Sequence, residues 1–316
     1  MTAPIIEAEG LAVNFRGPGG FLGLGARRLA ILEDVSLRVH KGETLGLVGE
    51  SGSGKTTLAR TLLGLVPAAR GTIRFDGAPV ERFGSLRRRT AMMFQDPVAS
   101  LSPRLAIGSA ITEPFVIHGV AMGSRRQAAE ELLDLVGLPK DFITRYPHEL
   151  SGGQARRAGV ARALALKPDL VIADEPTAGL DVSIQGEILN LMTRLKAELR
   201  LSYVIVTHNL AMIRHVSDRI AIMYLGRIVE EGPTPEVFAK TRHPYTASLI
   251  ASEPIPDPRR KRRSLAITGE VPSIQNRPTG CEFHTRCPYA QERCRNEAPS
   301  LSVTGSHGVR CHFPLN

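Results

Sequence analysis

The sequence predicts an α/β protein whose sheet is mostly parallel. Of its 316 residues, 42% are hydrophobic and 22% are charged, a composition that excludes a disordered or collagen-like chain. Short apolar runs bounded by glycine or proline indicate strands, and they alternate with segments whose apolar residues recur at helical spacing. Such alternation is typical of a parallel sheet covered by helices.

The first elements are read in chain order from these patterns. Strands are expected at residues 5–15, 30–39, 44–48, 72–75 and 90–94. A helix is expected at residues 54–65, with Pro67 ending it. A glycine-rich segment without periodicity, residues 17–28, connects the first two strands.

The pattern changes between residues 96 and 167, where apolar residues recur at helical spacing and no strand is indicated. We interpret this segment as an inserted helical subdomain. Strands return at residues 170–173, 203–207, 219–224 and 227–229. The predicted domains are residues 1–95 with 168–235 for the core, 96–167 for the helical subdomain, and 236–316 for a C-terminal extension.

Charge and hydropathy limit the classes of protein. The net charge is +9, which suits nucleic acid, anionic lipid or nucleotides, but the absence of Trp argues against a base-stacking surface. No apolar run approaches the roughly 20 residues that cross a bilayer, and the first residues lack the pattern of a secretory signal. We expect a cytosolic protein, or one that docks on a membrane through partners.

The strongest motif is GESGSGKT at residues 49–56, directly after a predicted strand and at the start of a predicted helix. Its glycines allow backbone N–H groups to surround a phosphate, and the helix N-terminus favours the same anion. Lys55 is expected to reach the β- and γ-phosphates, and Thr56 to bind Mg²⁺. An ordinary glycine turn is the alternative, which this context disfavours. The residues assigned to nucleotide binding here are Gly49, Glu50, Ser51, Gly52, Ser53, Gly54, Lys55, Thr56 and Thr57.

Two acids follow the apolar strand in LVIADE, at the carboxyl end where parallel sheets bind ligands. We expect Asp174 to hold the Mg²⁺ shell and Glu175 to act as the general base on an attacking water. The alternative is an acidic helix cap before Pro176, but the phosphate loop favours the catalytic interpretation.

The LSGGQ string at residues 150–154 resembles the signature of ATP-binding cassette (ABC) proteins. Further motifs occur in the order of that family: a Q-loop glutamine, Gln95, in FQDP; a D-loop aspartate, Asp181, in AGLD; and a switch histidine, His208, in VTH. Phe15 stands where the family has an aromatic that stacks on adenine, although a core position is the alternative. The resemblance covers roughly residues 5–252.

The resemblance implies a role for each motif. Gln95 would be a Mg²⁺ ligand that links the ion to the helical subdomain, and His208 would hold the γ-phosphate and the water. The signature would close over ATP bound to a second subunit, so that ATP holds the two subunits together and hydrolysis releases them. The signature and D-loop residues assigned to nucleotide binding are Ser151, Gly152, Gly153, Gln154 and Asp181.

Within the family, RYPHELSGGQ, IADEPTAGLD and GEVPSIQNRPTGCEFHTRCPYAQERC are similar to the ATPase subunits of dipeptide and oligopeptide permeases and to their C-terminal extension. The glycine-rich segment is similar to the one of two paired subunits that is often encoded second. The resemblance implies a P-loop nucleotide-triphosphatase core with an antiparallel N-terminal β-subdomain. It also implies an ATP-hydrolysing subunit, peripheral at the cytoplasmic face of the cell membrane. Its expected partners are a second ATPase subunit, two transmembrane permease subunits and, indirectly, an extracytoplasmic solute-binding protein.

All four cysteines lie in the tail, as Cys281, Cys287, Cys294 and Cys311. Clustered thiols in a cytosolic protein more often hold a metal than form disulfides, and a turn-rich tail needs such a staple. The spacing is not that of a zinc knuckle, whereas four thiolates can hold a [4Fe–4S] cluster, as in some similar extensions. A four-thiolate zinc site and metal-free thiols stay open, with His284 and His312 as substitute ligands.

The remaining alternatives concern the linker and the cargo. Residues 256–264, a proline-rich basic linker, are either a solvated tether or a patch that touches membrane phosphates or RNA. The same ATPase could serve nickel chelates or glutathione instead of peptides. A soluble ABC protein of ribosomes or DNA is disfavoured because one phosphate loop and one LSGGQ occur. A regulator that does not hydrolyse ATP is disfavoured by Glu175 and His208.

Overall fold

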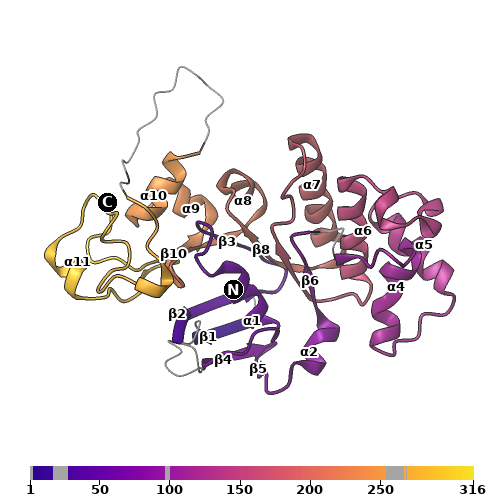
Figure 1. The fold of residues 1–316 in the computed structure, drawn as a ribbon, viewed down its shortest axis with the longest axis horizontal. Coiled ribbons are helices and arrows are strands. Elements are labelled where there is room, and N and C mark those ends of the chain that lie inside the picture. Colours follow the sequence, from indigo (N-terminus) through magenta and orange to yellow (C-terminus); the bar gives the residue numbers. More distant parts are fainter. Residues whose placement is uncertain (1–2, 17–27, 97–99, 254–266, 268) are drawn as a thin grey trace, which may run out of the picture. The chain divides into compact units, whose positions relative to one another are not determined.

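The computed structural model describes residues 3–16, 28–96, 100–253, 267 and 269–316 (Figure 1). Most of the glycine-rich segment and the whole basic linker therefore lie outside the described residues. The chain divides into two compact units, each built from separate segments. The first unit contains Met1–Ile5, Val39–Glu43 and Phe75–Val206, and the second contains Ile6–Arg38, Thr44–Arg74 and Thr207–Asn316.

The sheet of the first unit is parallel. Its strands are β6 (Thr90–Met93), β7 (Leu170–Asp174) and β8 (Ser202–Thr207). The register pairs Thr90 with Leu170 and Leu170 with Ser202. Every residue of β7 and β8 is buried, which explains why both strands are continuous apolar runs rather than alternating ones.

The part of the first unit between β6 and β7 is helical. It contains α4 (Ile107–Ile117), η1 (Lys140–Thr144), η2 (Pro147–Glu149), α5 (Arg125–Leu135) and α6 (Gly152–Leu164). Helix α4 packs against both α5 and α6, and Ile111 of α4 and Leu133 of α5 are fully buried. The other elements of this unit are β5 (Ala78–Pro79), α2 (Phe83–Arg89) and α7 (Val182–Leu199).

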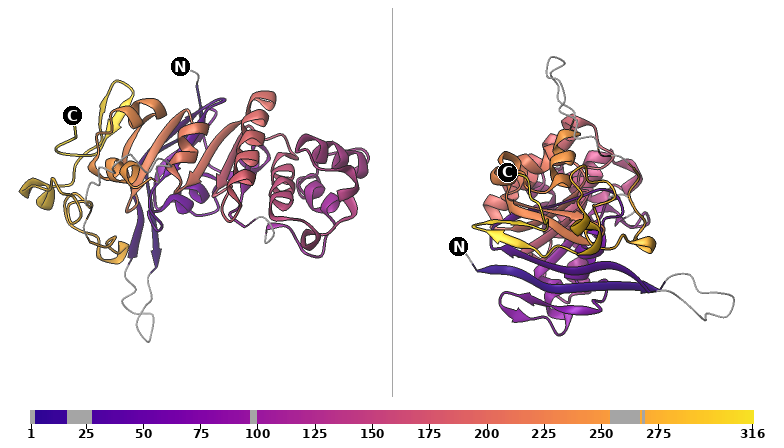
Figure 2. Two further views of the ribbon diagram at one scale, coloured as in Figure 1. Left: turned by 90° about the horizontal axis from the view of Figure 1, so that it is seen from above. Right: turned by 90° about the vertical axis from the view of Figure 1, so that its left-hand side faces the viewer.

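The second unit has strands in two sheets. One contains β3 (Thr44–Val48), β9 (Arg219–Tyr224), β10 (Arg227–Pro233), β12 (His307–Val309) and β11 (Ser302–Thr304). Strand β3 is parallel to β9, and the later pairs are antiparallel. The other is the antiparallel N-terminal sheet, in the order β2 (Arg28–His40), β1 (Pro4–Arg16) and β4 (Arg70–Phe75). Figure 2 shows β1 and β2 as two long strands side by side.

The helices of the second unit are short. They are α1 (Lys55–Leu62), α8 (Leu210–Val216), α9 (Thr234–Ala239), α10 (Pro244–Ala251), η3 (Ile274–Asn276) and α11 (Glu292–Asn296). Helix α1 ends earlier than expected, because Gly64 has a φ of 68°. A left-handed glycine stops a helix, so the end is set by Gly64 and not by Pro67.

The predicted fold class is confirmed: the protein is α/β, with an antiparallel N-terminal sheet and a mixed, mostly parallel core sheet. The tail carries one feature that the sequence did not indicate. Strands β11 and β12 form a hairpin that pairs with β10 and so extends the sheet, with Glu230 of β10 opposite Val309 of β12. Strands of three residues are too short to produce a readable alternation.

Candidate nucleotide-binding site

The predicted phosphate loop, residues 49–56, connects β3 to α1 in the second unit. Gly49 has no room for a side chain, since a Cβ there would lie 2.2 Å from the carbonyl oxygen of Met223. Gly54 has a φ of 99° and precedes the first residue of α1, and its carbonyl accepts a hydrogen bond from the Leu58 amide. The two glycines are therefore required by a close approach and by a left-handed backbone.

Lys55 lies inside this loop. Its Nζ donates hydrogen bonds to the carbonyl oxygens of Gly49 at 2.7 Å and Glu50 at 2.9 Å, and the residue is buried. A buried ammonium surrounded by a curled backbone is the arrangement that suits a phosphate group.

A turn of the same unit is hydrogen-bonded to the loop. The amide of Gly226, between β9 and β10, donates to the carbonyl of Ser53 at 2.8 Å. Gly226 has a φ of 79°, and a Cβ would lie 2.0 Å from the carbonyl oxygen of Ile31. Only glycine fits between the loop and β2 at this point.

The two predicted acids lie at the end of β7 in the first unit. Asp174 is buried, and Glu175 follows it with a φ of 49°, in the left-handed region that a non-glycine residue rarely adopts. The Glu175 amide donates to the Val206 carbonyl at 2.8 Å. Five other described non-glycine residues also have a positive φ, so this backbone conformation alone does not identify a functional residue.

The signature forms the N-terminus of α6, also in the first unit. Ser151 Oγ accepts a hydrogen bond from the Gln154 amide, and Gln154 Oε1 accepts one from the Ser151 amide. This reciprocal capping box fixes the start of the helix, where Gly152 and Gly153 add no side chains over their N–H groups. Such a terminus favours an anion.

Helix α6 packs closely on α7, which begins after the D-loop residue Asp181. A Cβ at Gly153 would lie 2.9 Å from Cγ2 of Ile184. The second glycine of the signature is therefore also a packing residue.

Arg156 is a site residue that the sequence interpretation missed. It is 2% exposed, and its guanidinium donates to the carbonyl oxygens of Phe94, Gln95 and Ala178 at 3.0, 2.8 and 3.3 Å. Burial lowers its pKa. This one side chain links the signature helix to the Q-loop and to the segment before the D-loop. No sequence signal distinguishes Arg156 from the adjacent Arg157.

The other predicted residues stand at the ends of strands. Gln95 is exposed just after β6, and His208 is exposed between the end of β8 and Asn209, whose side chain caps α8 by accepting from the Met212 amide. Phe15, near the end of β1, is 43% exposed. Phe15 is thus not a core residue, and part of its side chain is exposed to solvent.

The four cysteines are free thiols in the second unit, with Cys294 buried and the other three half-buried. The Cys281 amide donates to the Cys294 carbonyl at 2.8 Å. Burial, with smaller effects from other charged groups, among them neighbouring cysteines, raises the pKa of Cys281 to about 12 and of Cys311 to about 11.

The thiols are therefore near one another, yet no group of three or more His, Cys, Asp or Glu side chains in the described ranges is arranged to hold a metal ion. Each of the two candidate substitute ligands has one ring nitrogen in a hydrogen bond. The His284 ring interacts with the Cys281 carbonyl and the His312 ring with the Glu297 carbonyl.

Comparisons with known proteins agree with these motifs. The family description "ABC transporter" matches residues 32–178, and "Oligopeptide/dipeptide transporter, C-terminal region" matches residues 229–294. A probable peptide ABC transporter ATP-binding protein of Sinorhizobium fredii is 45% identical over 99% of this chain and 90% of its own length. The oligopeptide transport ATP-binding protein AppF of Bacillus subtilis is 45% identical over 89% of each chain.

Among solved structures, the dimeric ATP-binding cassette MJ0796, bound to ADP and phosphate after hydrolysis, superposes with a TM-score of 0.64 at 27% identity. The match covers 72% of this chain and 98% of that one. In the part of the chain that the structure describes, no helix is both long and apolar enough to cross a membrane.

The fold, the phosphate loop and the signature helix together define an ATPase of the ABC transporter class. More closely, the chain belongs to the ABC transporter ATP-binding proteins of the oligopeptide/dipeptide transporter family. ATP and Mg²⁺ are the ligands that this class requires.

Proposed function

We propose that this chain is the ATP-hydrolysing subunit of a membrane importer of dipeptides and oligopeptides, acting at the cytoplasmic face of the cell membrane. The observation that carries the proposal is a preformed phosphate loop around the buried Lys55, in a chain whose tail matches the oligopeptide/dipeptide transporter region. The similarity to proteins named for peptide transport supports peptides as the cargo.

Binding and hydrolysis divide among the site residues by their chemistry. The loop amides and Lys55 bind the β- and γ-phosphates, and Phe15 stacks on adenine. Thr56, Gln95 and Asp174 offer hydroxyl, amide and carboxylate oxygens, the donor set that Mg²⁺ prefers; when bound, the ion neutralises phosphate charge. Glu175 accepts a proton from the attacking water, and His208 holds that water and the γ-phosphate.

The signature serves the nucleotide of a second ATPase subunit. Ser151 and the open N-terminus of α6 offer a hydroxyl, N–H groups and the positive end of a helix dipole. Asp181 reaches the same composite site from the start of α7. ATP then joins the two subunits, and its hydrolysis lets them separate.

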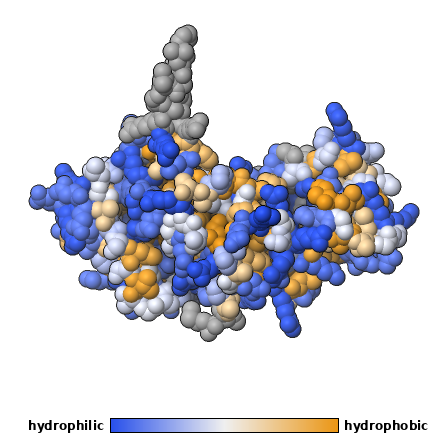
Figure 3. All heavy atoms as spheres, turned by 90° about the horizontal axis from the view of Figure 1, so that it is seen from below, coloured by the Kyte–Doolittle hydropathy of each residue, from blue (hydrophilic) through white to orange (hydrophobic). Residues whose placement is uncertain are grey.

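The permease subunits dock on the helical part of the first unit. A hollow of about 190 Å³ opens there, lined by Met92, Phe94, Ile117 and His118 among others. Ile117, which lines it, is 66% exposed, and the next residue in the chain before it, Val116, is 59% exposed. Figure 3 shows apolar residues gathered on the helical part of the surface, at the right of the view. Exposed apolar side chains beside a hollow suit an apolar permease segment.

The tail holds a [4Fe–4S] cluster through Cys281, Cys287, Cys294 and Cys311. The four thiols are free and close enough for their charges to interact, although the described residues contain no group arranged to hold a single metal ion. A [4Fe–4S] cluster is larger than one ion and so accepts more widely spaced ligands than zinc does. When bound, the cluster links four points of the tail and stabilises it. Anaerobically purified full-length protein should contain iron and acid-labile sulfide; zinc, or no metal, would contradict this assignment.

The test of ATP hydrolysis is Glu175→Gln in the assembled transporter. The change removes the proton acceptor and leaves the phosphate loop intact, so ATP binding should persist while turnover falls at least about a hundredfold. Glu187→Gln, an exposed residue of α7, is the matched control and should leave turnover unchanged. Steady-state hydrolysis that survives Glu175→Gln would refute the assignment of the base.

A further inference from the structure

The four-cysteine tail contacts the phosphate loop through one ion pair. Arg286, adjacent to Cys287, donates Nη1 to Oε2 of Glu50 at 2.7 Å and Nη2 to Oε1 of Glu50 at 3.0 Å. Glu50 is the second residue of the loop. The geometry is the paired, two-point contact that makes arginine–carboxylate bonds strong and directional.

The pair is shielded from water on the arginine side. The Arg286 side chain is 9% exposed and that of Glu50 is 28% exposed, and the guanidinium lies 5.9 Å from the centre of the Tyr224 ring. The Glu50 carboxylate raises the pKa of Arg286. A partly desolvated pair is worth more than a surface pair, and loss of one partner leaves the other charge without compensation.

The backbone of Glu50 is held by the same region of the chain. Its amide donates to the hydroxyl of Tyr245 at 2.9 Å, and its carbonyl accepts from Lys55 Nζ. The rings of Tyr245 and Tyr224 contact Phe283 of the tail, with centres 5.4 and 5.3 Å away. The side chain, the amide and the carbonyl of Glu50 are thus all held by hydrogen bonds. The bond to its carbonyl comes from Lys55, so Glu50 also connects this region to Lys55.

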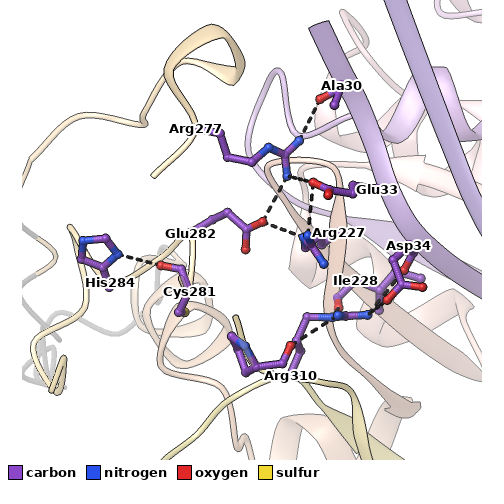
Figure 4. Close-up of polar contacts among 11 residues, drawn as sticks. Ala30, Glu33, Asp34, Arg227, Ile228, Arg277, Cys281, Glu282, His284 and Arg310 are labelled. Atoms are coloured by element: carbon purple, nitrogen blue, oxygen red, sulfur yellow. Dashed lines mark hydrogen bonds and ion pairs between the residues drawn. The ribbon is translucent and has the colours of Figure 1, made fainter. Parts of the chain in front are cut away.

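The tail that carries Arg286 is itself anchored. Arg277 and Arg227 both pair with the buried Glu282, at 3.1 and 2.6 Å, and Arg310 pairs with Asp34 of β2 at 3.1 Å. Figure 4 shows these contacts, with the tail residues and those of β2 and β10 pointing toward one another. Arg286 therefore projects from a fixed support, so its contact can restrain the loop.

We propose that Arg286 is a positioning residue for nucleotide binding, which holds the phosphate loop through Glu50 in the conformation that accepts ATP. The four-cysteine tail is then part of the ATP site of its own chain. The inference rests on the proposed function of this loop as the ATP site. Its physical basis is preorganisation, since a loop already fixed loses less conformational entropy when it binds phosphate.

The experiment measures the affinity of the full-length chain for a fluorescent ATP analogue with Mg²⁺. Arg286→Ala and Glu50→Gln should each weaken binding about tenfold, and the double variant should be no weaker than either single one, because the two changes remove the same contact. Arg286→Lys, which keeps the charge but loses the two-point geometry, should recover part of the affinity. Arg293→Ala is the matched control, since this exposed arginine of α11 pairs only with Glu297 in the described chain.

A second readout separates positioning from a general loss of structure. In the assembled transporter, Arg286→Ala should raise the KM for ATP while kcat at saturating ATP stays within about twofold, since uniform binding changes KM alone. Glu50→Gln carries the test if Arg286→Ala does not fold.

Lys55→Ala separates the assignment of the loop as the ATP site from the role of Arg286 in positioning that loop. If Lys55→Ala binds the analogue as tightly as the wild type, the assignment of the loop as the ATP site fails. If Lys55→Ala loses binding while Arg286→Ala and Glu50→Gln retain wild-type affinity, the role of Arg286 is overturned and the ATP site stands. Additive losses in the double variant would also overturn it.

Discussion

At Gly49 the predicted phosphate loop lies against the carbonyl of Met223, so the conformation of the proposed ATP site depends on the absence of a side chain there. Gly49→Ala should therefore destabilise the fold by about 1–3 kcal/mol and remove ATP binding, because the loop must shift away from β9. The matched control is Gly77→Ala, whose φ is also positive but whose Cβ meets no atom within 4 Å.

Gly77→Ala should lower the free energy of unfolding by about 1 kcal/mol and leave ATP affinity unchanged. Urea unfolding and nucleotide titration of the two variants provide the comparison. Equal ATP affinity of Gly49→Ala and the wild type would show that the loop has no fixed conformation.

Residues whose chemistry needs a fixed local spacing could be predicted from the sequence. Lys55 and Glu175 belong to this kind. Lys55 stands where the loop meets α1, and Glu175 directly follows β7, so the local motif alone sets the position of each. Arg156 and Arg286 could not be predicted. Their partners lie 61 and 236 residues away, at Gln95 and Glu50, and such pairings arise only from the folded chain.

At the scale of the element, helix α10 begins on a fully buried histidine. His243 caps the helix by accepting from the Tyr245 amide through Nδ1, and its own amide donates to the carboxylate of Glu230. Burial lowers the pKa of His243 to about 3, with a bond to the Arg310 backbone opposing this. The ring of the folded chain is therefore mostly neutral at neutral and mildly acidic pH.

The pH dependence of stability follows from this helix cap. Unfolded His243 takes up a proton near pH 6.5, whereas the folded form does not, so the unfolded state binds more protons between about pH 3 and 6.5. Stability must fall as the pH falls through this window. Between pH 7 and 5.5 the loss should be about 1 kcal/mol.

The control is His243→Asn, since asparagine also caps helices and does not titrate. The free energy of unfolding, measured in urea at both pH values, should fall more in the wild type than in this variant. The same decrease in both proteins would mean that the ring is protonated in the folded state.

Helices and strands with a clear hydrophobic pattern could be predicted from the sequence. Strands that form only because they pair with a neighbouring strand could not. The helices from α4 to α6 have apolar residues at helical spacing, and β7 and β8 each contain an apolar run, LVIA and YVIV. The hairpin of β11 and β12 has strands of three residues that exist because β10 offers a free edge. The start of that hairpin has no local signal.

At the scale of the whole molecule, the proposed contact with the permease subunits can be tested directly. Ile117→Asp tests the proposed docking surface, because burying a carboxylate in an apolar contact is strongly unfavourable. Co-purification of the permease subunits should fall at least about tenfold, with ATP binding unchanged. Val303→Asp, at a similarly exposed residue of β11, should leave co-purification intact.

Loss of permease with both variants, or with neither, would place the docking surface elsewhere.

The overall fold class and the order of the motifs could be predicted from the sequence, because both depend on patterns that repeat or on spacings of a few residues. The hollow proposed for docking could not be predicted, because residues of β6, α4 and α6 line it together.

ATP hydrolysis by this chain is proposed to drive peptide import. The most direct test of this claim is uptake of a radiolabelled tripeptide by proteoliposomes that contain the purified transporter and its solute-binding protein, with ATP enclosed. The peptide should accumulate only with ATP, and a transporter that carries Glu175→Gln should accumulate none. Peptide accumulation that persists in this variant, or ATP-driven uptake of glutathione or a nickel chelate in place of the peptide, would contradict the claim.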